Sequence, residues 1–139
     1  MKRSCFKKEK EEDFIKAYEE ELKSLGDIAP YLSREAIINR ALHSGKGRYY
    51  ISFDEAARNV RKIINKHPIS CKNLCKASMY EELSRKVMDY LKKRPNSTYR
   101  EALYTLLAED RASRFFFGVQ TARLILDRNR SRKRNVAVA

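Results

Sequence analysis

The chain repeats one pattern at a spacing of 66 residues. Arg34-Glu35-Ala36-Ile37 returns as Arg100-Glu101-Ala102-Leu103, and Arg48-Tyr49-Tyr50-Ile51 returns as Arg114-Phe115-Phe116-Phe117. Self-similarity at a fixed spacing is typical of duplicated supersecondary units that pack against each other. The sequence therefore predicts a fold of two related halves.

Each half has the periodicity of three helices. Apolar residues recur at helical spacing in six segments, which begin at about residue 9 and at Ser33, Ser52, Met79, Thr98 and Gly118. Ser52-x-x-Glu55 and Thr98-x-x-Glu101 are capping boxes, in which two side chains satisfy free N–H groups at a helix start. With only 4 Gly and 3 Pro in 139 residues, little interrupts these helices.

We therefore predict an all-α protein of about six helices. Two pseudo-repeated three-helix units, about 9–67 and 77–130, are expected to share one core, because each unit alone would leave its apolar stripe in water. Short extended aromatic corners at 48–51 and 114–117 connect the helices of each unit. Residues 1–134 are predicted to form a single helical domain, and residues 135–139 a disordered tail that ends a basic C-terminus.

The formal net charge of +13 comes entirely from the chain after residue 26. Residues 1–26 carry 7 basic and 7 acidic side chains, whereas residues 27–139 carry 24 basic and 11 acidic ones. The first segment is therefore predicted to be a neutral, ion-paired helix. A cationic body with a pI near 9.8 is typical of proteins that bind a polyanion.

The positive charge of the third predicted helix lies on one face. A rotation of about 100° per residue places its basic residues opposite the apolar stripe of Phe53, Val60 and Ile64. These basic residues are Arg58, Arg61, Lys62 and Lys66. An ordinary solvated face and a nucleic-acid-binding face both fit this pattern.

The C-terminal segment is denser in positive charge. Residues 123–139 hold six basic side chains and one acidic one, and the basic ones are Arg123, Arg128, Arg130, Arg132, Lys133 and Arg134. This density is typical of arms that neutralise phosphates and release counterions. A tail that only improves solubility is the alternative.

The two aromatic corners also allow two interpretations. They resemble stacking platforms on which splayed bases rest, yet a duplicated corner between helices more often packs in a core. We favour core packing, with at least one buried ring in each copy. The sequence leaves open whether Arg48 and Arg114 pair with Glu35 and Glu101 or bind phosphate.

No motif for metal binding or catalysis stands out. His67, Cys71 and Cys75 lie four residues apart, but they lack a Cys-x-x-Cys knuckle, and Cys5 is distant in sequence. We predict unligated thiols, no metal, no cofactor and no enzymatic activity. The absence of a signal peptide or membrane-spanning run favours the cytoplasm and argues against a membrane partner.

Three features together resemble a known group. They are Arg48-Tyr49-Tyr50-Ile51-Ser52 with its copy Arg114-Phe115-Phe116-Phe117, the helix start Met79-Tyr80-Glu81-Glu82 between them, and the basic C-terminus. Over roughly residues 33–134 the chain is similar to poorly characterised small basic proteins of Bacteroidetes phages and mobile elements. Gly47 and Ser113 stand where that group has proline. The resemblance implies a phage or mobile-element setting and no particular activity.

Two functions follow as hypotheses. The first is a non-enzymatic nucleic-acid-binding protein that contacts the backbone of DNA or RNA with weak sequence preference, in the cytoplasm of a bacterial host or in a virion. The second is a protein-docking structural or accessory subunit of a larger assembly, either a virion or a nucleic-acid-handling complex. Leu124, on the outer side of the sixth predicted helix, is a candidate for such an interface.

Overall fold

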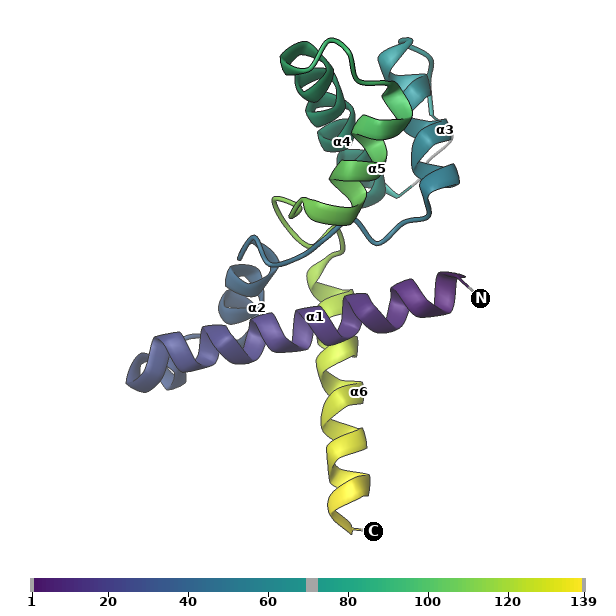
Figure 1. Cartoon of the computed structure of the whole chain (residues 1–139). Coiled ribbons are helices and arrows are strands. Elements are labelled where there is room, and N and C mark those ends of the chain that lie inside the picture. The colour runs from purple at the N-terminus through teal and green to yellow at the C-terminus, as the bar shows by residue number, and fades with distance from the viewer. Residues whose placement is uncertain (1, 70–72, 139) are drawn as a thin grey trace.

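Helices account for nearly all the regular structure of the chain. The computed structural model describes residues 2–69 and 73–138, with residues 2–5 and 134–138 described by their backbone alone. Over these ranges there is no strand, so the all-α prediction is confirmed (Figure 1). The elements are α1 (Lys2–Leu25), the 3-10 helix η1 (Gly26–Tyr31), α2 (Arg34–Leu42), α3 (Phe53–Ile64), α4 (Leu74–Lys93), α5 (Tyr99–Glu109) and α6 (Val119–Val138).

Side-chain caps start four of the helices. Ser33, Ser52 and Thr98 each accept a hydrogen bond from the backbone N–H three residues later, as predicted. Asn73 does the same for Lys76, so α4 begins at Leu74 and not near Met79. At the end of α1, Gly26 has a φ of 52°, the left-handed conformation that glycine adopts without strain.

The C-terminal helix is longer than predicted. α6 continues to Val138, so residues 135–138 are helical instead of disordered, and Ala139 lies outside the described residues. After Gly118 the chain contains neither glycine nor proline, and arginine and lysine are good helix formers. The basic segment is thus a continuation of α6.

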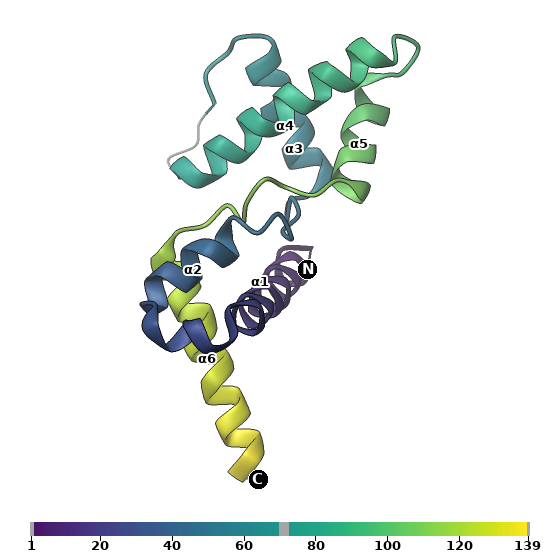
Figure 2. The same ribbon diagram turned by 90° about the vertical axis from the view of Figure 1, so that its left-hand side faces the viewer.

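The helices form two lobes, each with its own buried cluster (Figures 1 and 2). In the first lobe, here called the α1 lobe, α1, α2 and α6 enclose side chains such as Phe14 and Ile38. In the second, the α4 lobe, α3, α4 and α5 enclose side chains such as Tyr80 and Leu103. The prediction of a single shared core is therefore wrong.

The last helix of each predicted unit packs in the lobe of the other unit. α3 contacts α4 and α5, while α6 contacts α1 and α2. The two connecting segments meet between the lobes, where the Ala112 N–H donates to the Gly47 carbonyl at 2.9 Å and the Phe115 N–H donates to the Leu42 carbonyl at 2.8 Å. One extended segment leads from α2 to α3 in the α4 lobe, and the other leads from α5 to α6 in the α1 lobe. The apolar side chains therefore form two separate cores. The internal repeat itself stays a prediction.

The aromatic corners pack inside the molecule, as the core-packing interpretation predicted. Tyr49 stacks on Phe116 and Tyr50 stacks on Phe115, in both cases with ring centroids 6.4 Å apart. Tyr49 and Phe115 are buried in different lobes, so each corner ties the two lobes together. A Cβ at Gly47 would lie 3.1 Å from the Phe115 ring, which explains the absence of a side chain at this close approach.

The arginines that precede the corners bind backbone carbonyls. Arg48 donates to the Ala108 carbonyl at 3.0 Å, and Arg114 donates to the carbonyls of Phe115 and Phe117 at 2.9 and 3.0 Å. Neither arginine pairs with the carboxylates considered above. Arg48 thus ties its corner to the last turn of α5, and Arg114 satisfies carbonyls of its own corner, which have no helical partner.

A buried carboxylate anchors the corner to α4. Glu82 accepts hydrogen bonds from the Tyr49 hydroxyl at 2.6 Å and from both the backbone N–H, at 3.1 Å, and the hydroxyl of Ser113. Burial raises the pKa of this carboxyl, but the bonds from Ser113 and Tyr49 and the charge of Lys86 outweigh burial and hold the pKa below its usual value. The folded protein therefore favours the ionised form.

We expect Glu82→Gln to lower the free energy of unfolding by about 1–3 kcal/mol at neutral pH, because a neutral amide binds the donors of Tyr49 and Ser113 less well. A depressed folded pKa gives stability that is complete above the unfolded pKa and is lost as pH falls through the folded pKa. The difference from wild type should therefore shrink in urea unfolding at about pH 3. Glu81→Gln, an exposed neighbour on the same helix, is the control. A difference that is the same at both pH values would contradict this role.

Candidate nucleic-acid interface

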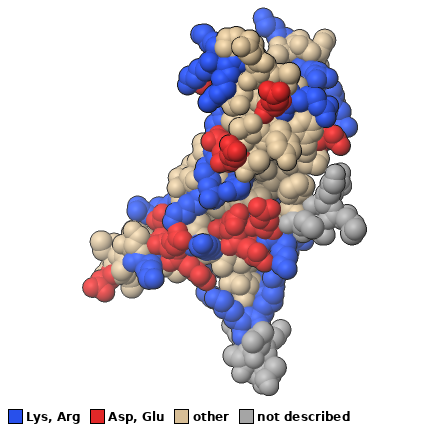
Figure 3. Space-filling view, viewed as in Figure 1, with Lys and Arg blue, Asp and Glu red and all other residues tan. Residues whose placement is uncertain are grey.

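A basic groove runs between α3 and α5 in the α4 lobe. It is a hollow of about 450 Å³, and we call it the α3–α5 groove. Its charged and aromatic lining consists of Asp54, Arg58, Arg61, Lys62, Tyr99 and Arg100, together with Phe53 and His67. Figure 3 shows basic side chains over α3 and also over the far end of α4 in this lobe, whereas acidic side chains concentrate over α1. Three of the four α3-region residues predicted from the sequence line this groove.

Aromatic rings support two of the groove arginines. The Arg61 guanidinium lies 4.9 Å from the centroid of the Tyr99 ring, and that of Arg100 lies 5.1 Å from the centroid of the Phe53 ring. Tyr99 is fixed in turn, because its hydroxyl donates to the Ala57 carbonyl of α3 at 2.7 Å. Burial raises the pKa of Tyr99, which keeps the hydroxyl protonated as a donor. A stacked guanidinium keeps its N–H edge available for a ligand.

The cations of this region are not neutralised by neighbours. Among the side chains that the structure describes, no carboxylate forms an ion pair with Arg58, Arg61, Lys62, Lys66 or Arg100. Arg58, Arg61, Lys66 and Arg100 are exposed, and Lys62 is half-buried. Lys66 follows the end of α3 with a φ of 61°, outside the lining of the groove. The positive charge of the groove is therefore open to an external anion.

The basic residues of α6 differ from those of α3 in this respect. Arg123 pairs with Glu35 at 3.3 Å, and Lys133 pairs with Glu19 at 3.2 Å. Arg128 and Arg132 lie 3.5 and 3.9 Å from the Glu11 carboxylate of α1. Arg130 is exposed, and the side chain of Arg134 lies outside the described residues. The ten predicted site residues are thus divided between two lobes, and most of the described cations of α6 serve to hold α1.

The carboxylates of α1 take part in many of these ion pairs. Among the described side chains, they pair with cations of other elements. Glu21 pairs with Arg40 of α2 at 3.2 Å, and Glu20 pairs with Lys46, which follows α2. Together with Glu11 and Glu19, these residues turn α1 into an acidic surface for the cations of other elements.

Residues 66 positions apart carry different charges in the two lobes. Arg34 of α2 corresponds to Arg100 of α5, and Asp127 of α6 corresponds to Arg61 of α3. In the α1 lobe, Arg34 and Asp127 form an ion pair at 2.7 Å. In the α4 lobe two arginines occupy these positions, and each rests on an aromatic ring. Arg34 and Asp127 thus form an ion pair, whereas Arg100 and Arg61 have no carboxylate partner among the described side chains.

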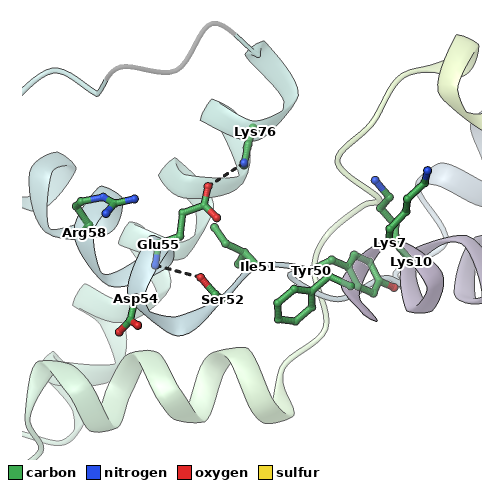
Figure 4. Close-up of a pocket in the computed structure, with 10 residues that line it drawn as sticks. Lys7, Lys10, Tyr50, Ile51, Ser52, Asp54, Glu55, Arg58 and Lys76 are labelled. Carbon is green, nitrogen blue, oxygen red and sulfur yellow. Dashed lines mark hydrogen bonds and ion pairs between the residues drawn. The ribbon is translucent and has the colours of Figure 1, made fainter. Parts of the chain in front are cut away.

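A second hollow of about 570 Å³ lies between the lobes (Figure 4). Lys7 and Lys10 extend from α1 on one side, and Arg58 and Lys76 stand on the other. Lys76 is paired with Glu55 at 2.9 Å, and burial lowers the pKa of Lys10. Arg58 lines both hollows, so the inter-lobe hollow extends the groove toward α1.

Sequence reasoning missed Arg100, Lys7 and Lys10. Arg100 belongs to the repeated Arg-Glu-Ala motif, but its position over Phe53 depends on packing between α3 and α5. Lys7 and Lys10 lie in the segment whose charges cancel. One signal was present in the sequence. Arg34 pairs with Asp127, but the positions 66 residues from these two hold Arg100 and Arg61, which cannot pair with each other.

The histidine and cysteines that we predicted to be unligated are only partly described. Cys71 and the side chain of Cys5 lie outside the described residues, and Cys75 is a free thiol. Elsewhere in the described part of the chain, no three His, Cys, Asp or Glu side chains cluster in a way that would hold a metal ion.

Every helix within the described ranges is too short or too polar to cross a lipid bilayer.

Comparison of the chain with known protein families, curated proteins and solved structures finds no match. Its class is therefore defined by its own geometry: a two-lobed, all-helical protein with a cationic groove on one lobe.

Proposed function

We propose that this chain is a non-enzymatic nucleic-acid-binding protein that holds the phosphate backbone in the α3–α5 groove. The observation that supports the proposal is the set of cations without carboxylate partners among the described side chains: Arg58, Arg61, Lys62, Lys66 and Arg100. On α6, by contrast, four of the five described cations pair with carboxylates, so the unpaired cluster on α3 and α5 is the better candidate for binding an external polyanion.

The chemistry of the groove favours phosphate. A guanidinium presents a planar fork of N–H donors that matches two phosphate oxygens, and a ring beneath it fixes the fork in place. Contacts to phosphate position a nucleic acid but do not read its sequence. We therefore propose weak sequence preference, in the phage or mobile-element setting that the doubled aromatic corner implies, within a bacterial cytoplasm or a virion.

A salt titration tests this proposal. Occupation of the groove by about four phosphates predicts that the logarithm of the binding constant falls with the logarithm of the salt concentration, with a slope of about −3 to −4. Fluorescence anisotropy with labelled oligonucleotides of unrelated sequence measures this slope. Sequences should differ little in affinity. A flat salt response, or no binding at low salt, would remove the proposal.

A second candidate function rests on the exposed apolar surface of α6. Leu124 is 60% exposed, as expected for the outer side of this helix. An accessory subunit that docks onto a larger assembly would cover such a residue. Mass measurement of the purified protein, with and without nuclease, separates the two functions: a nuclease-insensitive oligomer favours docking, and co-purifying nucleic acid favours the groove.

A further inference from the structure

Tyr104 is an exposed aromatic ring beside the α3–α5 groove. It is 67% exposed, and among the described aromatic residues only Tyr31 is also exposed. Every other described aromatic ring is at least half-buried in a lobe or a corner. Single exposed apolar residues are common on protein surfaces, so the neighbours of this ring decide whether it has a role.

The fold does not require a ring at this position. The residue 66 positions earlier, Ile38, is fully buried in the core of the α1 lobe. Tyr104 is instead turned to the surface of α5, outside the buried cluster of its own lobe. Its contribution to the core of the α4 lobe is therefore small.

Tyr104 extends the row of cations and rings that forms the groove. Arg100 and Tyr104 lie one turn apart on α5, so they share a face of that helix. Phe53 contacts both, with its centroid 5.1 Å from the Arg100 guanidinium carbon and 6.3 Å from the Tyr104 centroid. Phe53 lines the groove and also an adjoining hollow of about 240 Å³, which Tyr104 lines as well.

This arrangement suits a strand whose bases are not paired. In a duplex each base face is covered by its neighbours, so a protein ring gains little from lying near it. A single strand exposes both phosphates and base faces, and binding proteins for such strands combine a cationic groove with stacking aromatic rings. Arg61 and Arg100 in the groove and Tyr104 in the adjoining hollow provide both kinds of contact.

We propose that the α3–α5 groove takes single-stranded nucleic acid, with one base stacked on Tyr104. The inference rests on the proposed function and specifies its ligand class. The phosphates of the strand bind the groove cations, and the base between them turns toward α5. DNA and RNA share this chemistry, and both are tested.

The test compares Tyr104→Ala with wild type by fluorescence anisotropy at fixed low salt. The probes are labelled single strands of about 12 nucleotides, as DNA and as RNA, and a duplex of the same sequence. We expect about a tenfold loss of affinity for the single strands, since a stacked base contributes a factor of that order, and less than a twofold change for the duplex. Tyr104→Phe, which keeps the ring, should retain the affinity. Tyr31→Ala, which removes an exposed ring of η1, should change neither.

The outcomes separate this inference from the proposed function. An unchanged affinity of Tyr104→Ala for both single strands, or an equal loss on strand and duplex, overturns the stacking role while salt-dependent binding persists. Loss on one of the two single strands alone supports stacking and identifies the sugar. If no probe binds in a salt-dependent way, the proposed function itself fails.

Discussion

Replacement of Phe115 with alanine should lower the free energy of unfolding by about 3–5 kcal/mol, the range for deletion of a fully buried aromatic ring. Phe115 is 0% exposed, and its ring packs edge-on against Phe14 with centroids 5.4 Å apart. It also stacks on Tyr50 of the other corner. The substitution therefore opens a cavity in the α1 lobe and removes a tie between the lobes. Such a loss is a large part of the stability of a domain of this size.

Urea unfolding followed by far-ultraviolet circular dichroism measures this effect. Tyr31→Ala, at a ring that is 88% exposed, is the matched control and should change the free energy of unfolding by less than about 0.5 kcal/mol. If Phe115→Ala does not fold, Phe115→Leu, which keeps more apolar volume, should fold with a smaller loss. A loss below about 1 kcal/mol for the alanine variant would contradict the burial described here.

Neutralisation of two groove cations should weaken nucleic-acid binding at moderate salt by about tenfold or more. The double variant Arg58→Gln, Lys62→Gln removes two charges that have no carboxylate partner among the described side chains. Each lost phosphate contact makes the slope of the salt dependence shallower by about 0.9, so the pair should change it by about 2. The loss should be uniform across sequences, because these groups contact phosphate.

A second pair on α6 supplies the control with the same change in net charge. Arg128→Gln, Lys133→Gln also removes two charges, but these side chains are occupied by Glu11 and Glu19. Its effect on the salt slope should be small. Equal effects of the two variants would show that binding depends on total charge, and a larger effect of the α6 pair would move the interface to α6.

The starts of helices were predictable because they depend on residues a few positions apart. Ser33, Ser52 and Thr98 act as the caps that the sequence indicated. The start of α4 was missed because its predicted apolar stripe begins only at Met79, whereas Asn73 caps the helix earlier in the chain. Its extra turn depends on a single side-chain acceptor, which is a weaker signal.

The exchange of α3 and α6 between lobes was not predictable from the stripes. Helical periodicity tells which face of a helix is apolar, but not which other helix covers it. The decision lies in the corners, where Tyr49 and Phe115 enter different cores. The sequence indicated that both corners are buried, but not in which core. Only the packing of the whole chain shows whether a corner packs with the helices of its own half or with those of the other half.

The candidate site was predictable in part. The face of α3 was found from its periodicity, and the structure leaves it unpaired within the described residues. The basic residues of α6 look equally open in the sequence, since the carboxylates that neutralise them are far away: Lys133 and Glu19 are 114 residues apart. Ion pairs between such distant positions leave no local pattern.

The exchange of helices also has a consequence for biosynthesis. During synthesis α1 and α2 leave the ribosome before α6, yet α6 completes the core in which they pack. The α4 lobe, whose helices are contiguous from residue 53 to 109, is complete earlier. α1 and α2 are therefore synthesised well before the helix that completes their core, and contacts of such long sequence separation favour slow folding.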